Sequence, residues 1–443
     1  MKNLLKAILF AASLSGCASY RKLPLPTTPA FPQRLEVDAS SLHFPGLSSH
    51  RFDPSDGLDM TEVAMLAVSN NPALKLARDD AGIAGAQAFA AGLLPDPGFG
   101  YSPQIPQNAL PGENFTAFDL GLNYDFGALM TRSLRVAAAK ADRRKADLSL
   151  LWQEWQVVGE SRLLFARIRA REKETGILKM RRELLAQRQR REESVPGDLT
   201  SAVVTMDANA LQAMDRQIEE SARLALKDRG ALDALLGLSP EARLDLVGEP
   251  EIPDPDGAEI ARRIVALSRF RPDLRALEAG YEAQDFRLRK AILAQFPAIG
   301  VGLIRSGDNT GIHYNGFSLN LSLPIFNGNR GNVAIEQATR KRLHDEYQAR
   351  LNAASAEVRQ ILADRKLLDG ELSGLDANLA RLSRLSSAAE EAYREGNLDL
   401  AAYSAIREAE LSGKSERNAV RESILEERIA LLTLVGGQNR ESK

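Results

Sequence analysis

The stretch NGFSLNLSLPIFNGNRGN, residues 315–332, decides the fold because its apolar residues alternate with other residues. From Phe317 to Ile325 every second side chain is apolar, which is typical of a β-strand with one apolar and one polar face. The flanking sequence is rich in Ala, Leu, Arg and Glu, a composition typical of helices. A two-faced strand between long helices must be explained by what each face contacts.

The pattern around this strand occurs twice. Asn71-Pro72-Ala73-Leu74 returns as Arg271-Pro272-Asp273-Leu274, and the alternation from Phe118 to Phe126 resembles that from Phe317 to Ile325. Such an internal duplication predicts two copies of one structural unit. We expect each copy to contain a helix, a strand pair, a long helix and another helix.

The N-terminus has the features of an export signal. A short apolar run ends in Leu14-Ser15-Gly16-Cys17 and is too short for a permanent membrane helix. This ending resembles the lipobox of bacterial lipoproteins, which implies cleavage after Gly16, acylation of Cys17 (with palmitate, for example) and, because Ala18 follows, sorting to the outer membrane. An incidental cysteine in an ordinary signal peptide is the alternative. Cys17 is the only cysteine, so no intramolecular disulfide can form.

These features divide the chain into six expected segments. A signal peptide precedes a proline-rich, lipidated tether, and a connecting loop separates the two repeats, whose strands fall within 97–127 and 297–326. The segments are residues 1–16 (signal), 17–57 (tether), 58–238 (first repeat), 239–257 (loop), 258–437 (second repeat) and 438–443 (tail).

Two interpretations of the alternating strands remain open. They could form an ordinary antiparallel sheet with one face on a core. They could also form a transmembrane β-barrel, for which strands of about 9–11 residues, such as Ala117–Phe126 and Asn315–Ile325, are long enough. In the barrel, the residues facing a water-filled lumen would be Asp119, Asn123, Asp125, Ser318, Asn320 and Ser322. Those facing lipid would be Leu120, Leu122, Tyr124, Phe317, Leu319, Leu321 and Leu323.

The number of strands constrains the barrel. Gly98–Ile105 and Ala298–Arg305 are candidate partner strands, which gives four strands per chain. Unpaired edges are not tolerated in lipid, and single-chain barrels begin at about eight strands. If the strands span a membrane, several copies of the chain must therefore pool them.

Long spans without proline predict long helices. The longest are expected at about 130–194 and 330–394, each about 100 Å in length at about 1.5 Å per residue. Shorter helices are expected at about 58–94, 199–237, 258–295 and 399–435. Two short helices end to end would match one long helix. A coiled-coil seam is expected from the spacing of Leu368, Leu372, Leu375, Leu379 and Leu382.

The duplicated pattern, the segment LNLSLPIFNGNRGN, the helix starts NPAL and RPDL, and YREGNLDL at 393–400 resemble the TolC-type outer-membrane efflux channel family, in its lipoprotein branch. The resemblance implies a mainly α fold. Long antiparallel helical hairpins would form a periplasmic α-barrel, and four strands per chain would contribute to a twelve-strand membrane β-barrel in a homotrimer. It also implies a passive channel that docks to a periplasmic adaptor, or membrane fusion protein, and an inner-membrane transporter.

By the same resemblance, the glycine-containing turns near residues 197 and 396 would be adaptor-docking tips. Candidate tip and aperture residues are Gly197, Asp198, Gly396, Asp399, Arg407 and Glu408. A ring of identical charges can gate a pore, but charges that cap or solvate helix ends explain each residue equally well. Relatives often have acidic residues just after the second glycine turn. Ala401 and Ala402 stand there in this chain, which puts closure by an acidic ring in doubt.

Other chemistry is not indicated by the sequence. No catalytic constellation, phosphate-binding loop or Cys/His metal motif is visible, so we expect no enzyme activity, cofactor or metal site. The net charge of −2 gives no reason to expect a nucleic-acid partner. Trp152 and Trp155, three residues apart, are expected to pack rather than to bind a ligand. A lipid-anchored coiled-coil adaptor without a pore is the alternative function.

Overall fold

The computed structural model describes residues 19–32, 35–38, 42, 44–105, 107, 116–193, 201–254 and 257–436. Contacts divide the chain into two units, residues 1–34 and 35–443. The described part of the first unit contains no helix or strand, and the second unit contains all the described helices and strands. Cys17 and the expected signal peptide lie outside the described residues.

Within residues 35–443 the main elements, which are helices, a strand pair, a long helix and another helix, occur twice after the short helix α2 (Pro45–Ser48), with one additional short helix in each set (Phe126–Met130 in the first, Leu267–Phe270 in the second). The first set is α3 (Met60–Asn70), α4 (Pro72–Gly92), β1 (Gly98–Gln104), β2 (Ala117–Asp125), α5 (Phe126–Met130), α6 (Arg132–Glu193) and α7 (Ser201–Leu235). The second set is α8 (Gly257–Val265), α9 (Leu267–Phe270), α10 (Pro272–Leu293), β3 (Ala298–Gly307), β4 (His313–Ser322), α11 (Arg330–Arg394) and α12 (Leu400–Val435). The predicted fold class, long helical hairpins with four strands, is confirmed.

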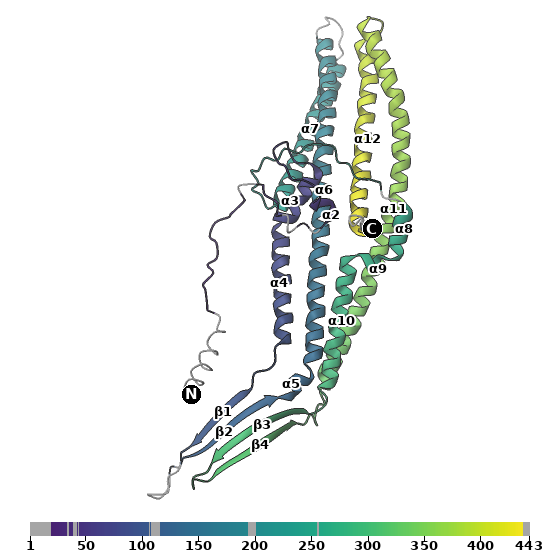
Figure 1. Cartoon of the computed structure of the whole chain (residues 1–443). Coiled ribbons are helices and arrows are strands. Elements are labelled where there is room, and N and C mark those ends of the chain that lie inside the picture. The colour runs from purple at the N-terminus through teal and green to yellow at the C-terminus, as the bar shows by residue number, and fades with distance from the viewer. Residues whose placement is uncertain are drawn as a thin grey trace. The chain divides into compact units, whose positions relative to one another are not determined.

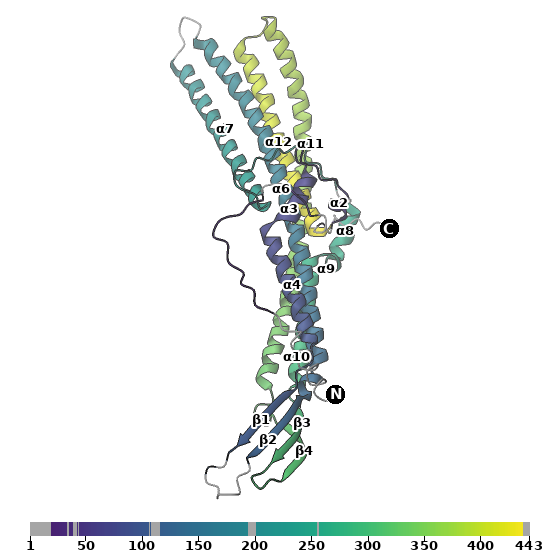
Figure 2. The same cartoon turned by 60° about the vertical axis from the view of Figure 1, so that its left-hand side comes forward.

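The four strands form one antiparallel sheet in the order β1-β2-β3-β4. Strands β2 and β3 join the two repeats, and β1 and β4 are the sheet edges. Figure 1 shows the sheet at the ends of α6 and α11 opposite to those at which α7 and α12 begin. In the turned view of Figure 2, the hairpins α6–α7 and α11–α12 extend side by side away from the sheet.

The predicted ends of two strands were wrong by one to three residues. Strand β4 ends at Ser322, not Ile325, because Pro324 has no N–H to donate to a ladder and its carbonyl instead accepts a turn hydrogen bond from Gly328 N at 3.0 Å. Strand β2 ends at Asp125, not Phe126, because the Asp125 carboxylate accepts a hydrogen bond from Ala128 N at 3.0 Å and caps α5.

The helix predicted at 58–94 is two helices that meet at Asn71. Pro72 disfavours a helical conformation in the residue before it, so α3 ends and α4 begins here. The Asn71 side chain accepts a hydrogen bond from Leu74 N at 2.9 Å and donates one to the carbonyl of Leu235, at the end of α7, at 2.8 Å. Asn71 therefore joins the start of α4 to the end of α7. The predicted end-to-end stacking of two short helices is confirmed.

The second repeat makes the equivalent joint with arginine. The helix predicted at 258–295 is three helices, and Arg271 precedes Pro272 at the start of α10. Arg271 is fully buried, pairs with Asp273 at 2.8 Å and lies over the ring of Trp152, 4.8 Å from its centroid. A desolvated cation–π contact of this kind is worth about 2 kcal/mol. Trp152 thus packs against the other repeat, as expected.

The hydrophobic core concentrates around these two joints. In the first repeat it includes Leu66, Phe165 and Leu232, and in the second it includes Leu274 and Val358. Each fully buried Leu or Phe contributes roughly 1.5–3 kcal/mol. The core therefore fixes the middle of the long helices.

Two leucines of the predicted seam of α11, Leu379 and Leu382, pack on α12. A Cβ atom on Gly413 of α12 would lie 3.5 Å from Leu379 and 3.6 Å from Leu382, so the missing side chain lets the two helices approach closely. Among the described helices, every one is too short or too polar to cross a bilayer.

We predict that Asn71→Ala lowers the free energy of unfolding by about 2 kcal/mol. The substitution removes a helix cap and leaves the Leu235 carbonyl without its donor, and each loss costs about 1 kcal/mol. Thermal unfolding followed by circular dichroism measures the change. Asn352→Ala, at an exposed helix position, is the control and should stay within about 0.5 kcal/mol of wild type. Equal midpoints for the two variants would contradict the role of Asn71.

Candidate functional site

The strand pairing sorts the sheet into two chemically different faces. Directly paired residues point to the same side of a sheet. Phe99, Leu122, Leu303 and Phe317 are paired in one row across all four strands. The neighbouring row on this apolar face is Tyr124, Val301 and Leu319. The residues predicted to face lipid on β2 and β4 therefore share one face, while those predicted to face a lumen share the other.

The central rows of the polar face carry mainly small side chains. Its central row is Asn123, Gly302 and Ser318. A Cβ atom on Gly302 would lie 2.3 Å from Asn123 Oδ1 and 2.7 Å from Ser318 Oγ, so both side chains lean over the glycine. Asp125 and Asn320 flank Gly300 in the next row. Ile304 is the one large aliphatic side chain on this face of the strands.

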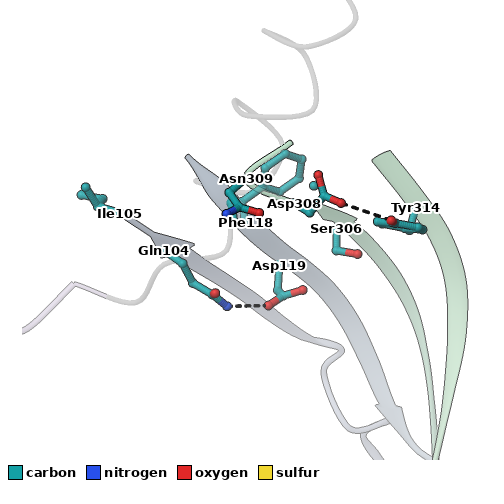
Figure 3. Close-up of a pocket in the computed structure, with 10 residues that line it drawn as sticks. Gln104, Ile105, Phe118, Asp119, Ser306, Asp308, Asn309 and Tyr314 are labelled. Atoms are coloured by element: carbon teal, nitrogen blue, oxygen red, sulfur yellow. Dashed lines mark hydrogen bonds between the residues drawn. The ribbon is translucent and has the colours of Figure 1, made fainter. Parts of the chain in front are cut away.

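A polar pocket lies at the end of the sheet where the strands are joined as hairpins. We call this the hairpin end. Figure 3 shows Gln104 Nε2 donating to Asp119 Oδ2 at 3.2 Å, and the Tyr314 hydroxyl donating to Asp308 Oδ2 at 3.2 Å. Asp308 lies in the β3–β4 turn, where hydrogen bonds from Thr310 and from the backbone of Ile312 lower the pKa of its carboxyl group. The polar face thus carries acceptor groups up to the hairpin end.

The apolar face of the sheet is uncovered. Seven of its large side chains are between 45% and 83% exposed, and these are Phe99, Tyr101, Leu122, Leu303, Phe317, Leu319 and Leu321. Leu120 and Tyr124, on the inner strand β2, are half-buried. An exposed apolar patch of this extent marks an interaction or membrane surface. The interpretation of the strands as an ordinary sheet packed on a core of the same chain is wrong for the described residues.

The predicted tip residues have clear local roles where they are described. Gly197 and Asp198 lie outside the described residues. Gly396 has a φ of +80° and ends α11, a conformation that favours glycine. Asp399 caps α12 by accepting a hydrogen bond from Ala402 N at 2.7 Å. The rings of Tyr393 and Tyr403, which sequence reasoning missed, stack across this turn with centroids 5.0 Å apart.

The predicted charges near this tip are paired within the chain. Glu408 accepts a hydrogen bond from Arg181 Nε of α6 at 2.8 Å, which links the two hairpins. Arg407 pairs with Glu410, which is 2% exposed. Burial would raise the pKa of Glu410, but hydrogen bonds from Lys414 and Ser383 and the charge of Arg407 outweigh burial and lower the pKa to about 2. Glu410 was not singled out by sequence reasoning because its partners come from two helices.

One group with metal-ligand atoms was also missed. The ligand atoms of His50, Asp59 and Glu62 lie within 4.8 Å of one another. Asp59 and Glu62 form the capping box of α3, in which Asp59 accepts from Thr61 N and both Glu62 oxygens accept backbone N–H groups. Three of the four carboxylate oxygens therefore already accept backbone N–H groups, and a helix N-terminus disfavours cations. The arrangement is that of a helix cap, with His50 3.5 Å from Asp59.

Comparison with known proteins identifies the second repeat. Residues 265–437 match the family described as "Outer membrane efflux protein". The match covers less than half of the chain. The matched residues contain α9, α10, β3, β4, α11 and α12, and therefore half of the two-faced sheet and one complete helical hairpin. No curated protein matches the sequence.

Solved structures show the same fold over nearly the whole chain. The outer-membrane channel OprN is 18% identical, with a TM-score of 0.71 over 96% of this chain and 100% of its own. The CmeC outer membrane channel of Campylobacter jejuni is 18% identical, with a TM-score of 0.70 and 96% of each chain covered. The MtrE outer membrane channel of Neisseria gonorrhoeae is 18% identical, with a TM-score of 0.64 over 94% of this chain and 100% of its own. The fold is that of the TolC-type outer-membrane channels.

We predict a pH-dependent loss of stability for Glu410→Gln. Because the folded state lowers the pKa of Glu410 from 4.5 to about 2, its ionised form stabilises the protein above about pH 4.5. That contribution is lost as the pH falls towards 2. The melting temperatures of wild type and Glu410→Gln should differ most near neutral pH and converge below pH 4.5.

The control for this measurement is Glu371→Gln. Glu371 is exposed on α11 and forms no ion pair with a described residue. Its substitution should leave the melting temperature close to that of wild type across the same pH range. A Glu410→Gln difference that is constant from neutral pH to pH 2 would show that the ion-pair cluster does not act as described.

Proposed function

We propose that this chain is the outer-membrane channel of a tripartite efflux system. It conducts solutes passively from a periplasmic adaptor and an inner-membrane transporter to the exterior. The observation that carries the proposal is the uncovered, two-faced sheet at one end of long helical hairpins. The match of residues 265–437 to the efflux family supports it. In this role the chain catalyses no reaction and needs no cofactor.

The channel is a homotrimer in this proposal. Strands β1 and β4 each leave one edge unpaired within the chain, and open edges do not persist in lipid. If β4 of one copy pairs with β1 of the next, three copies close a barrel of twelve strands. A barrel of that size leaves a lumen, whereas one of about eight strands is filled by side chains. The hairpins α6–α7 and α11–α12 would then line up as a periplasmic helical tunnel.

In this barrel one face of the sheet would contact lipid and the other would contact water in the lumen. Lipid would contact Leu120, Leu122, Tyr124, Phe317, Leu319, Leu321 and Leu323. Water in the lumen would contact Asp119, Asn123, Asp125, Ser318, Asn320 and Ser322. The polar face of the four strands carries no Lys or Arg, so each copy contributes two carboxylates and no cation to the lumen wall. Such a lumen favours cations over anions.

The remaining parts act at the two ends of the channel. Acylated Cys17 would anchor the proline-rich tether in the outer membrane. The turns with Gly197, Asp198, Gly396 and Asp399 would be the tips that contact the adaptor. Arg407 and Glu408 would lie near the periplasmic aperture. There the Glu408–Arg181 pair would hold the two hairpins of one copy together, and Arg407 pairs with Glu410 within α12.

A planar-bilayer recording tests this function. The purified oligomer should give stepwise conductance with a reversal potential that indicates cation preference. A double variant, Asp119→Asn with Asp125→Asn, should keep the conductance and lose much of the preference because the lumen wall is then neutral. A well-assembled oligomer with no conductance would instead support a lipid-anchored adaptor without a pore.

A pair of arginine substitutions on β4 tests the assignment of the faces. Leu321→Arg places a charge on the proposed lipid face, which costs roughly 2–4 kcal/mol near the membrane midplane. Asn320→Arg places the same charge on the proposed lumen face. We expect Leu321→Arg to reduce the amount of oligomer in the outer-membrane fraction and Asn320→Arg to reduce it much less. Equal amounts would contradict the assignment of the two faces.

A further inference from the structure

The apolar face changes character towards the hairpin end of the sheet. Its rows are apolar or aromatic from Ile299 and Leu321 up to the row that contains Leu303 and Phe317. In the next row, Tyr101 and Leu120 are followed by Arg305 and Asn315, and the last row ends in His313. The face therefore has an apolar band with a polar, cationic border at the hairpin end.

The apolar band covers the strands from Ile299 and Leu321 towards the hairpin end and continues past the end of β4. On β4 the apolar residues Phe317–Leu321 rise roughly 10 Å along the membrane normal, at about 3.4 Å per residue and a strand tilt of about 40°. The exposed Leu323 and Ile325 extend the apolar surface beyond the end of the strand. Transmembrane barrels have an apolar band about 25 Å tall, with aromatic girdles at both borders. Arg305 lies one row beyond Leu303 and Phe317, in the same row as Tyr101 and one row from Phe118. It therefore occupies the level of an aromatic girdle.

The cationic border is available to a ligand. Arg305 is exposed and forms no hydrogen bond or ion pair with any described residue. Its directly paired neighbour Asn315 is also exposed. His313, one row further, packs its ring 5.8 Å from that of Phe118. A Cβ atom on Gly307 would lie 2.6 Å from the Phe118 ring and 2.9 Å from His313 Nδ1, so the glycine lets both rings close over it on this face.

We propose that Arg305, Asn315 and His313 form a binding site for the phosphate groups of lipid headgroups in the outer leaflet. The proposal rests on the function proposed above, because it requires the apolar face to be in a membrane. Arginine binds phosphate with two parallel hydrogen bonds, and the amide and imidazole groups add further donors. The hairpin end is the end remote from the helices, so a channel with periplasmic helices places Arg305 at the outer leaflet.

Lipid is the ligand that fits this position. The site lies on the face opposite to Asp119, Asn123 and Ser318, so a solute in the lumen would not reach it. The neighbouring rows of Leu303 and Phe317 offer a contact surface for acyl chains directly below the cation. A free phosphate would gain nothing from that apolar surface.

Native mass spectrometry of the purified, full-length oligomer tests the site, with diphosphoryl lipid A as the probe. Arg305→Gln should lower the apparent affinity for this lipid about fivefold, the effect of one basic residue worth about 1 kcal/mol near an anionic membrane surface. Arg305→Lys keeps the charge without the paired hydrogen bonds, so its apparent affinity for this lipid should lie between those of wild type and Arg305→Gln. Arg342→Gln, on the exposed surface of α11, is the matched control and should bind like wild type.

Three outcomes would overturn the site. They are equal binding by wild type and Arg305→Gln, equal binding of diphosphoryl and monophosphoryl lipid A, and displacement of lipid A by millimolar inorganic phosphate. Conductance of the same oligomers separates this test from that of the channel. If Arg305→Gln assembles, conducts and binds lipid A as well as wild type does, the lipid site alone is refuted. If the wild-type oligomer does not conduct, the proposed function is refuted.

Discussion

The sheet β1–β4 cannot be stable in water as one chain presents it. One face exposes Phe99, Leu303 and Phe317, and both edges lack partners. An isolated sheet of this kind would aggregate. Pairing of β1 and β4 edges between copies gives the edges their partners, and lipid covers the apolar face. Most of what we propose about this protein, including its oligomeric state and its location, follows from the need to cover the apolar face of this sheet and to pair its edges.

The helices meet a different requirement, which is to extend far from the sheet while staying in register. Two joints at mid-length achieve this. Asn71 uses its amide to join α4 to α7, whereas in the second repeat Arg271 is buried against Trp152 of the first. The repeats therefore have the same architecture but different joint chemistry. The arginine version also binds the two repeats to each other, as the Arg181–Glu408 pair does nearer the tips.

The main features of the fold could be predicted from the sequence because they depend on local periodicity. Alternation identified β2 and β4, and the glycine turn at Gly396 marked the end of α11. NPAL and RPDL were identified as helix starts, but the predicted helix ranges ran through Asn71 and Arg271 because the surrounding Ala- and Leu-rich sequence favours helix throughout. The partners of Glu410, Trp152 and His313 could not be predicted, since each contact joins segments whose distance depends on tertiary packing.

Cysteine accessibility along β4 tests the central claim most directly. The only native cysteine, Cys17, would be acylated and unreactive, so single cysteines introduced at positions 318–322 can be labelled one at a time in the assembled oligomer. We predict that a membrane-impermeant thiol reagent reacts at positions 318, 320 and 322 and not at 319 and 321, and that the reaction blocks conductance. Equal labelling at all five positions, or labelling at the apolar ones, would contradict a barrel with one face to water and one to lipid.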